Sequence, residues 1–174
     1  MKKILIVIVL LLGSITMMAQ HMNFLGKPLG CDINTFKQRM AQKGYKSIGE
    51  TEANIYSFNG IFGGDEVEVC ACVTPKSKIV FQIIIVYKSF VSHKYDASSV
   101  STQDFKFNEL TKAFSKKYGE PKATNKKFSF WELPTGTITI IKTGEEEDIT
   151  RNLLVSYEDE ASDTINNNES ESDY

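Results

Sequence analysis

The sequence predicts an α+β fold in which two helix-plus-three-strand units form an antiparallel sheet with the helices packed on one face. Three observations support this fold class. Two stretches place apolar residues at helical spacing and end at a glycine. Six shorter stretches are rich in β-branched and aromatic residues, with turn-forming residues between most of them. A helix followed by three strands occurs twice in this order along the chain.

The first unit begins with a predicted helix over residues 32–43. Asp32 can accept hydrogen bonds from the first free N–H groups, and Gly44 can end the helix in a left-handed conformation. The apolar stripe of this helix consists of Ile33, Phe36 and Met40. The three strands predicted after it cover residues 54–58, 66–73 and 79–87.

The second unit begins with a predicted helix over residues 102–118, which Gly119 and Pro121 end. Its apolar stripe consists of Phe107, Leu110, Phe114 and Tyr118. The strands predicted after it cover residues 127–133, 136–142 and 152–157. The two units correspond to possible repeats over residues 24–88 and 102–157. An internal duplication would explain this correspondence, and a chance similarity is the alternative.

The two ends of the chain differ in character from the body. Residues 1–19 have a basic start and an apolar run too short to span a bilayer, which is typical of a secretory signal peptide. We therefore expect an exported protein, periplasmic or extracellular, with no stable membrane anchor after signal cleavage. Residues 158–174 hold seven acidic and no basic residues, which predicts a disordered tail.

The body, residues 20–157, is expected to form a single α+β domain. Two of the 20 Lys and Arg precede it and seven of the 22 Asp and Glu follow it, so its net charge is +3. Such a small basic excess argues against nucleic acid as a partner.

The segments FKQRMAQKGY (36–45) and LTKAFSKKYGEP (110–121) open the two units. With the order of elements, they give residues 24–157 a resemblance to small exported bacterial modules of the β-lactamase-inhibitor-like type. The resemblance implies two helix-plus-meander repeats whose sheet binds a protein partner. It implies no individual contact residue, because the family's contacts do not map onto named positions here.

The stretch VEVCACV (67–73) holds two of the three cysteines. Alternation places its valines toward the helices and both Cys70 and Cys72 on the opposite face, with their Cβ atoms about 6.6 Å apart. A disulfide needs about 3.5–4.5 Å, so these two do not bond to each other. Packing as small apolar side chains is the first interpretation, and a disulfide from Cys31 to Cys70 or Cys72 is the second.

The strand predicted at residues 79–87 is apolar on both faces, whereas a half-exposed antiparallel strand alternates. Its second face predicts a binding surface, unless the other half of the chain covers it. The predicted binding face consists of Val80, Gln82, Ile84, Val86, Cys70, Cys72 and Trp131.

No nucleophile motif such as Gly-x-Ser-x-Gly occurs, so a non-enzymatic binding module is the preferred interpretation. The partner is an unidentified protein or envelope component, with a homodimer as a further option. The alternative is a small thiol- or metal-dependent enzyme or metal carrier using Cys70, Cys72 and His93. One cysteine pair with isolated histidines such as His21 is an incomplete ligand set, so we expect no metal and no cofactor.

The tail contains Asp163-Thr164-Ile165. This tripeptide resembles the Asp-Ser/Thr-aliphatic acceptor of a bacterial O-glycosylation system that acts on exported proteins. The resemblance implies glycosylation of Thr164, and an unmodified tail is the alternative.

Overall fold

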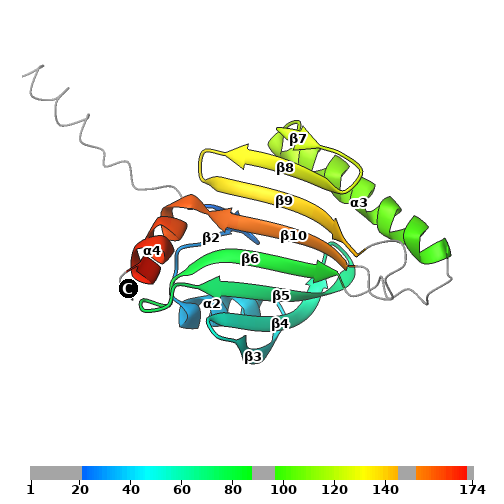
Figure 1. Cartoon of the computed structure of the whole chain (residues 1–174). Helices are drawn as coiled ribbons and strands as arrows, with labels where there is room; N and C mark the ends of the chain where they lie inside the picture. The colour runs from blue at the N-terminus through cyan, green and yellow to red at the C-terminus, as the bar shows by residue number, and fades with distance from the viewer. Residues whose placement is uncertain (1–20, 88–96, 145–151, 172–174) are drawn as a thin grey trace, which may run out of the picture.

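The computed structural model describes residues 21–87, 97–144 and 152–171 (Figure 1). The predicted signal peptide and His93 lie outside the described residues. The helices are α2 (Ile33–Gln42), α3 (Ala97–Tyr118) and α4 (Glu160–Glu171). The strands are β1 (Asn23–Phe24), β2 (Lys27–Pro28), β3 (Lys46–Glu52), β4 (Ile55–Phe62), β5 (Asp65–Val73), β6 (Val80–Tyr87), β7 (Ala123–Thr124), β8 (Phe128–Leu133), β9 (Gly136–Thr143) and β10 (Asn152–Asp159).

One antiparallel sheet of eight strands dominates the fold, in the order β3-β4-β5-β6-β10-β9-β8-β7. Strands from both halves of the chain share it because β6 pairs with β10, with Ile85 opposite Val155. The predicted α+β class with an antiparallel sheet is confirmed. The six predicted strands all form, and each differs from its prediction by only a few residues at its ends.

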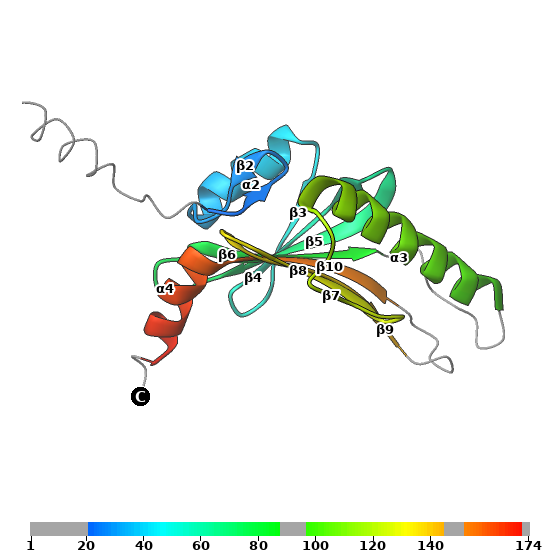
Figure 2. The same cartoon turned by 90° about the horizontal axis from the view of Figure 1, so that it is seen from above.

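The core lies between the sheet and helices α2 and α3, which pack on the same face of the sheet (Figure 2). One fully buried row crosses four adjacent strands and consists of Val69, Ile85, Val155 and Ile140. Aromatic contacts join each helix to the sheet. Phe36 of α2 meets Phe58 edge-on at 5.7 Å between ring centroids, and Phe114 of α3 lies 5.8 Å from Trp131.

Helix α2 forms as its local sequence predicts. The Asp32 carboxylate accepts hydrogen bonds from the backbone N–H groups of Asn34 and Thr35, at 3.0 and 3.1 Å. Gly44 has a φ of 85°, and the Tyr45 N–H donates to the Met40 carbonyl at 3.0 Å. The cap and the left-handed glycine satisfy the free backbone groups at both ends of the helix.

Helix α3 begins five residues before the predicted start at residue 102. Its buried stripe contains Phe107, Leu110 and Phe114, as predicted. Lys106 joins the helix to the sheet through an ion pair to Asp65 at the start of β5, at 2.6 Å. It also pairs within the helix with Glu109, at 2.9 Å.

The sequence did not predict edge strand β3 or the small hairpin of β1 and β2. Strand β3 has the sequence KSIGETE, and six of its seven residues are exposed, so no apolar alternation marks it. Its two register shifts and the positive φ of Gly49 also interrupt the pattern of a regular strand. An edge strand with few buried side chains is specified by pairing with β4, which a sequence pattern does not record.

The predicted disordered tail is where the structure differs most from the prediction. Strand β10 continues to Asp159, and α4 covers residues 160–171. Helix α4 lies on the face of the sheet opposite α2 and α3 (Figure 2). The prediction fails because contacts to the rest of the fold hold this helix, whose own apolar content is low. Within the described residues, no helix is both long and apolar enough to cross a membrane.

Candidate functional site

We call the side of the eight-stranded sheet that faces away from α2 and α3 the open face. Pairing across the strands fixes which side chains point to it, because directly paired residues share one face. A first row runs across β6, β10, β9 and β8 and consists of Val86, Leu154, Ile141 and Phe128. The next row consists of Cys70, Ile84, Ser156, Thr139 and Phe130.

The two rows carry six large apolar side chains that the fold leaves partly exposed. Ile141 is 37% exposed, and the other five are half-buried, whereas Ile83 and Ile85 beside them on β6 are 0% exposed. The other five are Ile84, Val86, Leu154, Phe128 and Phe130. The fold therefore leaves an apolar surface across four strands on the side that faces away from α2 and α3.

Four of the seven residues predicted for the binding face lie together on the open face. Gln82, Ile84 and Val86 come from β6, and Cys70 comes from β5. Cys72 points to the same face but is only 8% exposed. It lines a cleft of about 250 Å³ with Phe81 and with residues of α4.

Val80 and Trp131 were predicted on this surface and lie in the core instead, with exposures of 0% and 2%. A register shift between β5 and β6 pairs Val73 with Val80 but Cys72 with Gln82. The extra residue on β6 turns Val80 toward the helices, against simple alternation. Trp131 packs on Phe114, and its indole N–H donates to the Gly119 carbonyl at 2.8 Å.

The binding face predicted from the sequence does not include Leu154, Ile141, Phe128 and Phe130. Each lies at an alternating position of a predicted strand, which was the available signal. These residues form one surface with Ile84 only because β10 pairs with β6, a contact between strands more than 60 residues apart in the chain.

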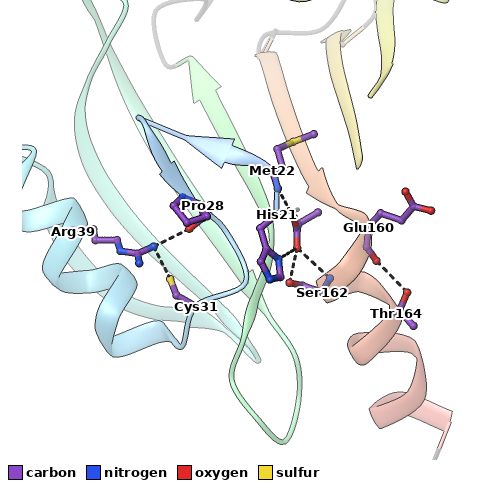
Figure 3. A network of polar contacts seen from close by, with 9 residues as sticks. His21, Met22, Pro28, Cys31, Arg39, Glu160, Ser162 and Thr164 are labelled. Atoms are coloured by element: carbon purple, nitrogen blue, oxygen red, sulfur yellow. Dashed lines mark hydrogen bonds and ion pairs between the residues drawn. The ribbon is translucent and has the colours of Figure 1, made fainter. Parts of the chain in front are cut away.

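The three cysteines are free thiols, which agrees with the first interpretation, packing, and not with the second, a disulfide from Cys31. Cys31 packs against the core on the helix side of the sheet, and Arg39 donates to its sulfur at 3.3 Å (Figure 3). Cys70 and Cys72 are on the other side of the sheet. A layer of backbone thus separates the two predicted partners.

Burial raises the pKa of all three thiols, and for Cys72 to about 11. Because the thiolate is the reactive form, we expect iodoacetamide at about pH 8 to modify Cys72 about 100-fold more slowly than an unperturbed thiol. Mass spectrometry of timed samples measures this rate. Modification of Cys72 as fast as that of a small free thiol in the same tube would contradict the structure.

Helix α4 borders one end of the open face. Hydrogen bonds attach both of its ends to the rest of the protein. Its C-terminal half is held by Glu169, whose carboxylate accepts hydrogen bonds from the backbone N–H groups of Lys76 and Ser77 in the β5–β6 turn. The pKa of Glu169 is lowered, first by a hydrogen bond from the Ser77 side chain and then by these two backbone N–H groups. Its N-terminal end is held by the carboxylate of Asp159, which is 0% exposed.

Asp159 is the centre of a polar network that joins the first described residues to α4. Figure 3 labels its partners His21, Met22 and Ser162. Its carboxylate accepts hydrogen bonds from His21 Nδ1 at 2.8 Å and from the Met22 N–H at 2.6 Å. The Ser162 N–H and Oγ donate to it at 3.1 and 2.5 Å, so Asp159 also caps α4. The spacing Asp-x-x-Ser was the sequence signal for this cap.

The residues Ser162, His21 and Asp159 are those of a hydrolase triad, but their connections differ. In a triad the serine hydroxyl donates to histidine, which the carboxylate orients from the other side. Here the Ser162 hydroxyl and the His21 ring both bind the carboxylate, and Ser162 is 0% exposed. The arrangement serves to join three parts of the chain.

Acidic side chains gather where α4 meets the edge of the open face. A cleft of about 270 Å³ is lined by Glu132 of β8, Glu158 of β10, and Glu160 and Asp163 of α4. Glu132 and Glu158 both pair with Thr137 of β9, so they point to the open face in one row. Lys122 forms an ion pair with Glu132.

Thr164 is exposed on α4, and its hydroxyl donates to the Glu160 carbonyl at 3.1 Å (Figure 3). Its O-glycosylation stays a prediction.

No group of three or more metal-binding side chains suited to a metal ion occurs in the part of the chain that the structure describes. No protein-family model, curated protein or solved structure matches this chain.

Proposed function

We propose that this protein is an exported, non-enzymatic binding module that contacts a protein partner through the open face of its sheet. The observation that carries the proposal is the group of six partly exposed apolar side chains in the two rows across β6, β10, β9 and β8. An antiparallel sheet that packs on its core through one face normally presents polar side chains to water on the other. Contiguous exposed apolar surface typically marks an interaction site.

Two further arguments support the proposal. The order of elements resembles that of β-lactamase-inhibitor-like modules, in which two helix-plus-meander repeats present a sheet to a protein partner, and we extend that arrangement to this chain. The expected export places the open face in an envelope or extracellular setting, where the partner would be found. The buried thiols, whose pKa values burial raises, give no support to the alternative of a thiol-dependent enzyme.

The substitution Ile84→Lys tests the proposal. Ile84 lies in the second row, between Cys70 and Ser156, and is half-buried, so lysine can extend its charged end into water. We expect the protein to stay folded and its affinity for a partner from envelope extract to fall by about tenfold or more. Pull-down with the mature protein, quantified by mass spectrometry, measures this loss.

Phe105→Lys is the matched control. Phe105 is 71% exposed on α3, outside the open face, so the same kind of change there leaves partner capture unchanged. If Ile84→Lys unfolds the protein in circular dichroism, the face is core and the proposal fails. Unchanged capture by a folded Ile84→Lys variant would also overturn it.

A further inference from the structure

The open face carries charge as well as apolar area, and the charge is mostly acidic, with Lys46 of β3 as a basic exception. Glu132 and Glu158 lie beside the apolar rows at the α4 end, in the cleft that Glu160 and Asp163 also line. Glu66 and Glu68 point to the same face from β5.

The carboxylates of this cleft are only partly neutralised. Glu132 has Lys122 as an ion-pair partner, whereas Glu158, Glu160 and Asp163 form no ion pair within the described residues. The free N–H groups of α4 explain a preference for acidic residues at its first turn, which covers Glu160 and Asp163. They do not explain Glu132 and Glu158, which come from the sheet.

Basic residues gather on the opposite side of the molecule. Helix α2 carries Lys37 and Arg39 and is followed by its C-cap Lys43, and helix α3 carries Lys112, Lys116 and Lys117. This separation makes the open face repulsive toward an anionic membrane or a nucleic acid. It also disfavours a two-fold dimer through the open face, because each subunit would present the same carboxylates to the other.

We propose that the occupant of the open face is a polypeptide segment whose apolar side chains are flanked by lysine or arginine. The apolar side chains of the segment contact the six partly exposed apolar residues of the two rows. A cationic side chain enters the cleft between Glu132, Glu158, Glu160 and Asp163, where a charge-assisted hydrogen bond to a carboxylate is available. This inference rests on the proposed function and adds the chemistry of the partner to it.

Three fluorescent synthetic peptides test the inference by anisotropy titration. They share one set of apolar residues and carry lysine, glutamine or glutamate at all other positions. We expect the lysine peptide to bind about tenfold more tightly than the glutamine peptide, and the glutamate peptide to bind most weakly. The preference for lysine decreases as salt is raised, because the carboxylates are exposed to solvent.

The double variant Glu132→Gln/Glu158→Gln identifies the cleft as the source of the preference. Both residues lie on strands rather than on α4, so the helix keeps its acidic first turn. We expect the variant to lose about fivefold in affinity for the lysine peptide and to bind the glutamine peptide as before. Glu120→Gln/Glu171→Gln changes the net charge equally at exposed positions outside the cleft and leaves all affinities unchanged.

The remaining outcomes separate this inference from the proposed function. Equal binding of all three peptides, abolished by Ile84→Lys, overturns the charge preference and leaves the binding face in place. Binding of none of the peptides also overturns the inference, and capture of the native partner by wild type and Ile84→Lys then decides the proposed function. Tighter binding to vesicles of anionic lipid than to the lysine peptide, or a dimer that Ile84→Lys disrupts, overturns the inference in favour of those occupants.

Discussion

Asp159→Ala lowers the free energy of unfolding by about 3–5 kcal/mol, because it removes the acceptor of four hydrogen bonds from a buried position. Alanine leaves the Met22 N–H and both donors of Ser162 without their acceptor. Each buried donor without a partner costs about 1–3 kcal/mol, and these costs do not simply add. Urea unfolding measures the change.

The same variant releases α4 from the open face before the rest of the protein unfolds. Hydrogen exchange should show faster exchange of the α4 amides, while those of β5 and β6 stay protected. His21→Ala is the control, because it removes one contact from a ring whose side chain is 34% exposed and should cost about 1 kcal/mol or less. A loss below about 1 kcal/mol for Asp159→Ala would show that the network does not hold α4.

Gly136→Ala is expected to have the second large effect. It should lower the free energy of unfolding by about 3 kcal/mol or more. Gly136 has a φ of 141°, which side-chain-bearing residues rarely adopt. A Cβ atom there would lie 1.9 Å from the Glu158 carbonyl oxygen. That oxygen is backbone, so β9 and β10 must separate locally where Gly136 pairs with Asp159.

Gly44→Ala is the matched control for the backbone conformation alone. Gly44 also has a positive φ, of 85°, but a Cβ atom there meets nothing within 4 Å. We expect it to cost about 1 kcal/mol, so the difference between the two variants measures the clash. Thermal and urea unfolding report both. Equal costs for the two substitutions would contradict the close contact between β9 and β10.

These two predictions concern the same corner of the molecule. Gly136 and Asp159 are paired residues at the ends of β9 and β10, and α4 begins at the next residue, Glu160. The cleft proposed to receive a cationic side chain is lined by this corner. A loss of structure here should therefore weaken the charge preference of the open face before it weakens its apolar contacts.

The local sequence was sufficient to predict elements whose signals lie within a few residues. Helix α2 is one example, because Asp32, its apolar stripe and Gly44 are all within or next to its ten residues. The half-exposed apolar character of β6 is another, since Ile84 and Val86 alternate with the buried Ile83 and Ile85 in the chain itself. These features depend on helical or strand periodicity and on caps, which are properties of short segments.

Only the tertiary structure decided which segments meet. The register shift that turns Val80 into the core arises where β6 pairs with Val73 of β5. The residue types of β6 do not predict this shift. The pairing of β6 with β10 brings Leu154 beside Val86, and thus makes one surface from two halves of the chain. Helix α4 depends on Asp159 and Glu169 bonding to distant backbone, which its own acidic sequence does not reveal. Sequence periodicity records which side of a strand is buried, but strand order and helix docking depend on contacts between residues far apart in the chain.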